Sequence, residues 1–209
     1  GVLRTRLNDD TRLTLVANVF DQPLSQDPLG LTRGQMQADP RQVDPSALSQ
    51  DTRKTVSQSQ AGVRLDHRLD AARSLGLRLY AGQRAVFQTL ATPLSAQTAT
   101  TAPGGVVDLD RDDGGLGLQY SHGVDLGESR LTTVVGLDHD RQREHRLGFM
   151  NLGGVPGTLK RDEWNRVENT DLYALAILRL PADWTLTAGA RSSRVAFRSD
   201  DRFIVAGNG

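Results

Sequence analysis

Apolar and polar side chains alternate with a period of two residues along most of this chain, and this pattern limits the fold more than any other feature. Residues 75–87, for example, place Leu77 and Leu79 on one side of an extended chain and Arg78 on the other. Successive side chains of a β-strand point to opposite faces, whereas a helix repeats every 3.6 residues. We therefore expect an all-β, antiparallel protein of about eight strands, over residues 12–20, 61–69, 75–87, 116–120, 131–138, 171–180 and 185–197 and the stretch before Asn8.

Short and long connections alternate between these segments. The short ones, at residues 8–10, 70–74, 125–129 and 181–183, are rich in Asp, Asn, Ser and Pro, which favour tight turns. Long connections are expected at residues 21–55, 91–105 and about 140–169, and in the tail after Ser199. This order predicts an up-and-down meander with short turns at one end and long loops at the other. Transmembrane β-barrels have this organisation, whereas soluble domains rarely contain structureless loops beyond ~12–15 residues.

In a barrel, the apolar faces of the strands would meet lipid and the polar faces would line a wet lumen. A wet interior is consistent with the hydrophobic content of 37%, below the ~45–50% of typical globular domains. Aromatic residues make up only 5%, however, which is low for a barrel with aromatic girdles. A soluble β-sandwich, for example a carbohydrate-binding module, therefore stays open as the alternative. The expected lipid-facing residues are Leu65, Leu77, Leu79, Leu118, Val135 and Leu178, and Arg64, Asp66, Arg78 and Arg84 are expected on the opposite face.

Composition argues against several other classes of protein. The chain has 25 basic and 25 acidic residues, so it lacks the basic excess of a nucleic-acid-binding protein. It contains no cysteine, which excludes a disulfide framework and thiolate metal sites. No apolar run approaches the ~18 residues of a transmembrane helix. The chain opens at Gly1 without a signal peptide and closes at Gly209, so we expect a segment of a longer protein.

Residues 20–54 resemble a loop of TonB-dependent outer-membrane receptors through the fragments FDQP, QDPLGLTR, ADPR and DTRK. The similarity continues in QAGVRLDHRL, YAGQRA, PGGVVDLDRD and RDEWNRVENTDLY, and it ends in LTAGARSSRVAFRSDD at residues 186–201. The resemblance implies that residues 1–209 are a partial β-barrel domain from the middle of a siderophore or iron-complex receptor in the Gram-negative outer membrane. We expect the family's signal peptide, plug and C-terminal strands to lie outside this chain, because eight strands compare with about 22 in such a barrel.

The function implied by this resemblance is the binding and import of a ferric siderophore or similar iron complex with energy from TonB, which the missing plug would contact. Outer-membrane lipid is the other expected partner, and we expect no cofactor, no nucleic acid and no enzymatic activity. Ferric siderophores are often anionic, and guanidinium groups suit carboxylate or catecholate oxygens. The candidate ligand-binding residues are therefore the long-loop cations Arg33, Arg41, Arg53, Lys54, Arg161 and Arg166. In the alternative reading, these cations pair with Asp27, Asp39, Asp44, Asp51, Asp162 and Glu163.

Other polar clusters suggest chemistry less specifically. His139 and His145 lie among acidic residues, but the HExxH spacing of a zinc hydrolase is missing, so solvated charges are expected there and metal-assisted hydrolysis is a third reading. Residues 108–113, DLDRDD, lack the central Gly and closing Glu of an EF-hand. The sequence therefore predicts no metal site. The glycines around Gly115 and Gly117 are expected to mark a bulge or a crowded strand.

Overall fold

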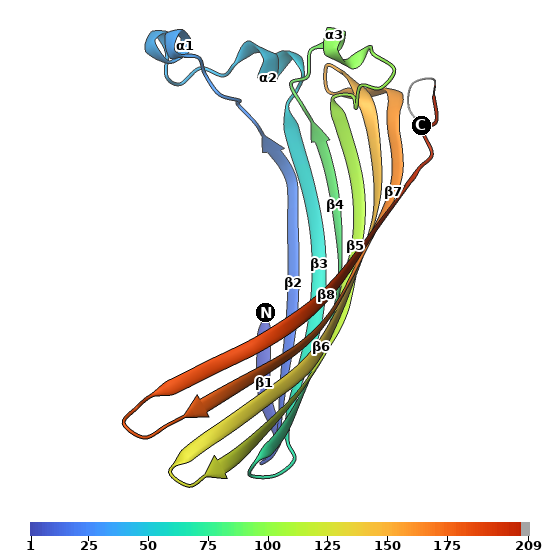
Figure 1. Cartoon of the computed structure of the whole chain (residues 1–209). Coiled ribbons are helices and arrows are strands. Elements are labelled where there is room, and N and C mark those ends of the chain that lie inside the picture. Colours follow the sequence, from blue (N-terminus) through green and yellow to red (C-terminus); the bar gives the residue numbers. More distant parts are fainter. Residues whose placement is uncertain (206–209) are drawn as a thin grey trace.

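Eight β-strands follow one another in chain order, and each pairs with the next (Figure 1). This computed structural model describes residues 1–205, and in it all seven strand pairs are antiparallel. The predicted all-β meander is confirmed, and residues 1–205 form no second sheet of the kind that a β-sandwich requires. The strands are β1 (Val2–Asn8), β2 (Thr11–Gln26), β3 (Arg53–Arg68), β4 (Arg73–Thr89), β5 (Val106–Leu126), β6 (Ser129–Leu152), β7 (Val155–Arg179) and β8 (Thr185–Asp201).

The two ends of the sheet differ as the connections predicted. The four short turns lie together at one end, and the helices α1 (Arg33–Ala38), α2 (Pro45–Ser49) and α3 (Leu94–Gln97) lie at the other (Figure 1). Turn chemistry explains the tight end: Gly127 adopts a φ of 64°, a left-handed conformation that Gly enters without a Cβ penalty. The second long connection, over residues 90–105, also agrees with the expected 91–105.

The prediction of a third long loop at about residues 140–169 is wrong. β6 and β7 continue through this region as strands and meet in a tight turn at Gly153 and Gly154, which have φ angles of 64° and 91°. Two successive residues with positive φ are typical of the two-residue turns that join antiparallel strands. The first long loop is likewise shorter than expected, because β2 extends to Gln26 and β3 begins at Arg53.

Polar cross-strand contacts explain why this hairpin continues where the apolar alternation stops. Nε2 of His145 on β6 lies 2.8 Å from Oδ1 of Asp162 on β7. The ring of His145 also stacks on the indole of Trp164, with 4.3 Å between the ring centroids. Strand pairing is made by backbone hydrogen bonds, so it does not require an apolar face once side chains of this kind match across the strands.

The strand register confirms the expected separation of faces. Leu65 lies opposite Leu77, and Leu77 lies opposite Leu118, so these leucines share one face. Arg64 lies opposite Arg78 on the other face. Because the side-chain period is two, the remaining predicted members of each set follow on the same strands and the strands paired with them. We call the leucine face the outer face and the arginine face the lumen face.

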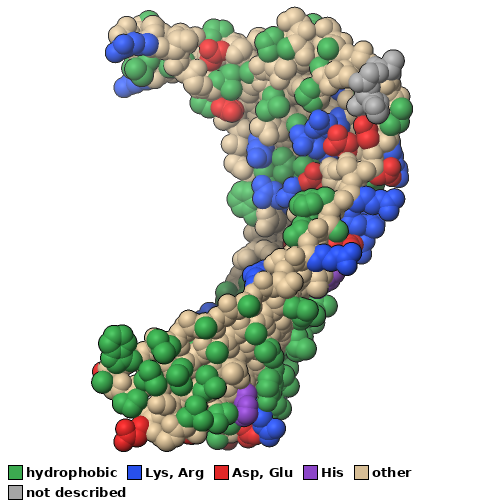
Figure 2. All heavy atoms as spheres, in the orientation of Figure 1, with side chains coloured by type: hydrophobic (Ala, Val, Ile, Leu, Met, Phe, Trp, Pro, Cys, Tyr) green, Lys and Arg blue, Asp and Glu red, His purple; other side chains and the backbone are tan. Residues whose placement is uncertain are grey.

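The outer face carries an exposed apolar band. Leu118 is 49% exposed and Leu172 is 57% exposed, and hydrophobic side chains gather over the lower half of the strands in Figure 2. Exposed apolar area of this extent is typical of a surface that meets lipid or a partner. Among the described residues, no helix has the length and apolarity needed to cross a membrane.

Candidate functional site

The lumen face holds polar side chains that reach over an intervening strand. Nη2 of Arg78 on β4 lies 3.1 Å from Oδ1 of Asp138 on β6, and the Tyr80 hydroxyl donates to Oδ1 of Asp140 at 2.6 Å. β5 runs between these strands, so each contact crosses two strand spacings, or ~9–10 Å of sheet. A concave face brings such side chains together.

Small residues on β5 leave room for these contacts. Gly117 lies between Arg78 and Asp138 in the register. A Cβ at Gly115 would lie 2.7 Å from Cε1 of Tyr80 and would also clash with the Asp140 carboxylate. The expected crowding of this strand is confirmed, whereas the alternative of a bulge is wrong, since β5 keeps an unbroken register with β4 and β6.

Two further groups of polar contacts lie on the lumen face, one between β5 and β6 and one between β7 and β8. Arg111 donates to Oε2 of Glu144 from Nε at 3.1 Å and from Nη2 at 2.5 Å, and Glu144 is only 8% exposed. Asp171, which is 1% exposed, accepts a hydrogen bond from Arg191 and another from Nδ2 of Asn169 at 2.7 Å. Paired in this way, buried charges become tolerable in a wall that faces water or a filled lumen.

At the loop end, one buried asparagine joins three connections. Asn151 on β6 donates from Nδ2 to the carbonyl oxygens of Gln50, at 2.8 Å, and Leu90, at 3.0 Å. Its own backbone N–H donates to Oε1 of Gln97 at 2.6 Å, and its Oδ1 accepts from Gly154 at 2.7 Å. The β2–β3 loop, the β4–β5 loop and the β6–β7 turn are therefore held as one unit.

Asp-Pro pairs organise the β2–β3 loop. Asp27, Asp39 and Asp44 each precede a proline, and each accepts a hydrogen bond at 2.9 Å from the backbone N–H two residues later. Asp44 is also the N-cap of α2, and the hydroxyl and backbone N–H of Ser46 and the amide of Gln35 lower the pKa of its carboxyl. These three acids therefore form turns and caps rather than ion pairs with the loop cations.

The predicted cations lie in different surroundings. Arg33 is the first residue of α1, Arg41 follows that helix, and both are exposed. Arg53 and Lys54 belong to β3 rather than to the loop, which corrects the expectation. Arg53 forms an ion pair with Asp51 and donates from Nη2 to the carbonyl of Gly154 at 3.1 Å.

Arg161 and Arg166 are strand residues of β7, again not loop residues, because the third long loop does not exist. Arg161 is on the lumen face, where Nε lies 3.0 Å from Oε1 of Glu163. Arg166 is on the outer face, as its register partner Arg143 is. Lys54 on β3 and Arg161 on β7 thus lie on the lumen face near the loop end but on strands that are not neighbours. Arg33 and Arg41 lie on the loop itself, and Arg166 lies on the outer face.

Two lumen-face cations near the loop end were not among the predicted binding residues. Arg84 on β4 donates to Oε1 of Gln58 at 3.3 Å, and Arg146 on β6 lies opposite Glu163. The period of two places Arg146 on this face when it is extended past Leu137. The apolar residues that mark the alternation on this strand end at Leu137, so the sequence pattern gives no clear signal there.

His139, His145 and the acidic residues 108–113 lie within strands, and both histidines contact side chains of β7. Nδ1 of His139 lies 2.9 Å from the Thr170 hydroxyl, and His145 pairs with Asp162 on the same face. Residues 108–113 lie within β5, so their side chains alternate between the two faces instead of converging as in a calcium loop. Within residues 1–205, no group of three or more His, Asp or Glu side chains is arranged to hold a metal ion.

A family model described as TonB dependent receptor-like, beta-barrel, matches residues 2–208. The chain belongs to this family. The resemblance of its loop and strand motifs to these receptors is thereby confirmed. The family comprises receptors and transporters of the Gram-negative outer membrane, and the meander described above is a section of its barrel.

Solved structures show the same fold at low sequence identity. The ferric citrate transporter FecA in its unliganded form is 15% identical, with a TM-score of 0.80 over 96% of this chain and 29% of that one. The ferric-catecholate import receptor Fiu from E. coli K12 is 13% identical, with a TM-score of 0.66 over 95% and 34%. P. aeruginosa FpvA bound to a pyoverdine–iron complex is 14% identical, with a TM-score of 0.65 over 96% and 30%. The chain thus spans about a third of the length of these receptors.

Proposed function

We propose that this chain forms part of the lumen wall and the outer loops of a receptor that binds a ferric siderophore or a similar iron complex. The observation that carries the proposal is the polar lumen face together with the three connections that Asn151 holds at one end of it. The similar structures are a ferric citrate transporter, a ferric-catecholate import receptor and a receptor bound to a pyoverdine–iron complex, which supports an iron complex as the class of ligand.

We further propose that residues 1–209 are a partial barrel domain within a longer protein. The eight strands compare with about 22 in a closed barrel of this class. The remaining strands and a plug that contacts TonB would complete the receptor, and TonB would supply the energy for import. The proposed function consists of binding and passage, so it involves no covalent chemistry.

The cations best placed to contact such a ligand are Arg33 and Arg41 on the β2–β3 loop and Lys54 on the lumen face. Arg33 and Arg41 are exposed, and within residues 1–205 neither forms an ion pair with a carboxylate. A free guanidinium group can donate two parallel hydrogen bonds to a carboxylate or catecholate ligand. Arg84 and Arg146 would add positive charge deeper in the lumen.

Binding of ferric citrate and of a ferric tris-catecholate to the full-length protein in detergent tests the proposal. We expect one of the two to bind, and we expect the Arg33→Gln/Arg41→Gln variant to raise its Kd about tenfold, because it removes two charge-assisted contacts. The control is Arg130→Gln at the opposite end of the sheet, where Arg130 pairs with Asp125 at 2.9 Å. Failure of the intact protein to bind either complex would contradict citrate-type and catecholate-type iron complexes as the ligand, and an unchanged Kd in the double variant would contradict the role of the loop cations.

A further inference from the structure

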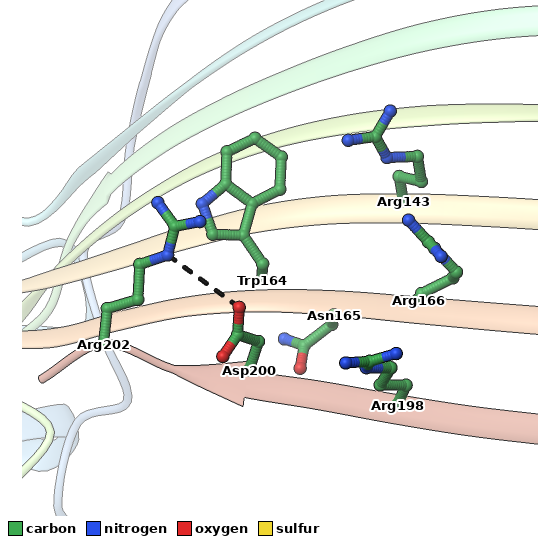
Figure 3. Close-up of a pocket in the computed structure, with 7 residues that line it drawn as sticks. All are labelled: Arg143, Trp164, Asn165, Arg166, Arg198, Asp200 and Arg202. Atoms are coloured by element: carbon green, nitrogen blue, oxygen red, sulfur yellow. Dashed lines mark ion pairs between the residues drawn. The ribbon is translucent and has the colours of Figure 1, made fainter. Parts of the chain in front are cut away.

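A row of three arginines crosses β6, β7 and β8 on the outer face. Arg143 is the register partner of Arg166, and Arg166 is the register partner of Arg198. Figure 3 shows the three side chains on successive strands, on one side of Trp164. Directly opposite residues in antiparallel strands have Cα atoms ~4.5–5.5 Å apart, and like charges at this spacing repel one another. A negatively charged group near this arginine row would therefore stabilise it.

The surrounding acids do not supply it. All three arginines are exposed, and none lies within 4.0 Å of a carboxylate in the described residues 1–205. Asp112 lies opposite Arg143 on β5 but forms no ion pair with it. Three other acids near the row already have partners: Asp200 with Arg202 at 3.9 Å, Glu168 with Arg141 at 3.7 Å and Asp162 with His145 at 2.8 Å. Asp110, next to Asp112 on the outer face of β5, forms no ion pair with the three arginines.

The height of the row on the sheet places it at a membrane surface. The apolar band on these strands begins at Leu131, Leu178 and Leu186, which are register partners. The apolar side chains of this band end at Leu137 and Leu172, six residues below the row. A hydrocarbon layer ~25 Å thick covers about ten residues of a strand tilted by ~40°, so counted from Leu131 it reaches the level of Arg141 and its partner Glu168. The row lies two residues above that level, ~5 Å beyond the hydrocarbon layer, where lipid head groups are expected. Its side chains point outward toward the leaflet, because they have the parity of the leucines.

A cavity of ≈ 340 Å³ adjoins the row, lined also by Trp164, Asp200 and Arg202. The guanidinium carbons of Arg143 and Arg202 lie 5.7 Å and 5.8 Å from the centre of the Trp164 ring. An indole at this height is typical of the girdle that marks the membrane interface. The cavity thus combines four guanidinium groups and one carboxylate with an apolar ring.

We propose that the arginine row binds the phosphate group of an anionic lipid of the outer leaflet. Guanidinium groups donate paired hydrogen bonds to phosphate oxygens, and a phosphate between three of them would remove their mutual repulsion. Basic side chains at the edge of an apolar surface are a common way in which membrane proteins recognise lipid head groups. This binding surface faces away from the lumen and is independent of the proposed iron-complex ligand.

Native mass spectrometry of the full-length protein in detergent tests this proposal with three probes: lipid A carrying two phosphates, its dephosphorylated form, and inorganic phosphate. We expect the phosphorylated lipid to bind, and Arg166→Gln, in the middle of the row, to weaken that binding about tenfold. The matched control is Arg146→Gln, which removes the same charge three residues from Arg143 on the same strand, but on the lumen face. This control should retain lipid affinity.

Three results would overturn the proposal. Equal binding of the phosphorylated and dephosphorylated lipids would show that the acyl chains, not the phosphate, are recognised. Equal loss in Arg166→Gln and Arg146→Gln would show a general effect of charge. Tighter binding of inorganic phosphate than of the lipid would assign the row to a free anion. Heat-dependent mobility in gels checks that each variant is folded, and ferric-complex binding measured in the same samples separates this proposal from the proposed function.

Discussion

Asp44 shows how one side chain orders a loop in this protein. Its carboxylate caps α2 by accepting from the backbone N–H of Ser46 at 2.9 Å, and it also accepts from Nε2 of Gln35 at 3.1 Å. The repeated Asp-Pro spacing places the same turn at Asp27 and Asp39. Because Pro has a fixed φ and no N–H, the Asp side chain meets the next free donor two residues later.

The lowered pKa of Asp44 predicts that the order of α2 depends on acid. Its hydrogen bonds with Ser46 and Gln35 hold the folded-state pKa below the ordinary value of 3.8. The ionised cap therefore stabilises the loop fully above pH 3.8, and this stabilisation is lost as the pH falls through the lower folded-state value. We expect the hydrogen-exchange protection factors of residues 45–49, which correct for the intrinsic pH dependence of exchange, to fall below pH 3.8 in the unmodified protein. Asp44→Ala should show low protection factors at every pH, and a pH-dependent fall of the same size in this variant would contradict the assignment.

Gly115 is a residue whose small size the lumen face requires. A methyl group there would lie 2.7 Å from Cε1 of Tyr80 and 2.9 Å from the carbonyl oxygen of His139. We expect Gly115→Ala to lower the free energy of unfolding by about 1–3 kcal/mol, through overpacking and loss of the Tyr80–Asp140 hydrogen bond. Urea titration in detergent micelles measures this change. Gly34→Ala in α1 is the control, because nothing lies within 4 Å of the added carbon, and it should cause no loss.

At the level of elements, the β6–β7 hairpin holds two loops by hydrogen bonds. Asn151 lies just before its turn and is 1% exposed. Its side chain satisfies two carbonyl groups from different connections, and Lys160 on β7 donates to the carbonyl of Ala99 at 2.7 Å. Loops tied in this way present a defined surface rather than an ensemble, which lowers the ordering cost of binding a ligand.

Removal of the Asn151 side chain should loosen both loops together. Asn151→Ala leaves the carbonyl groups of Gln50 and Leu90 and the N–H of Gly154 without these partners, at a cost of about 1–3 kcal/mol. We expect faster hydrogen exchange in residues 27–52 and 90–105, with the exchange of the strands unchanged. Asn165→Ala on β7 is the matched control, since its side chain makes no hydrogen bond in the described structure. Loosening of one loop alone would contradict the shared role of Asn151.

At the scale of the whole molecule, one sheet separates two environments. The outer face places an apolar band below a charged surface, whereas the lumen face carries paired charges at Arg78, Arg111 and Asp171. Figure 2 shows the same vertical division, with most Lys and Arg side chains over the upper half. A division of this kind is typical of a barrel wall that has lipid on one side and water or a plug on the other.

Adjacent residues on β5 test this separation of environments. Leu118 belongs to the apolar band and Gln119 to the lumen face. In lipid vesicles, Leu118→Arg should lower the free energy of unfolding by about 2–4 kcal/mol, the cost of a cation near the middle of a bilayer. Gln119→Arg should change it little, because its side chain enters the polar lumen. Similar losses in the two variants, measured by urea unfolding, would contradict the assignment of faces.

The sequence alone predicts the strands, their two faces, and the placement of short turns at one end of the sheet and long loops at the other. Each of these features depends on local rules. Side chains alternate along any strand, and Asp, Asn, Gly and Pro favour turns wherever they cluster. Only the folded sheet shows the other features. These are the extension of β6 and β7, the contacts across Gly115, the hydrogen bonds of Asn151 with three connections, and the arginine row. Arg143, Arg166 and Arg198 are far apart in the sequence and are not distinguished by any motif, and only the register of β6, β7 and β8 makes them neighbours. Such contacts are set by pairing between distant strands, which the period of a single strand does not encode.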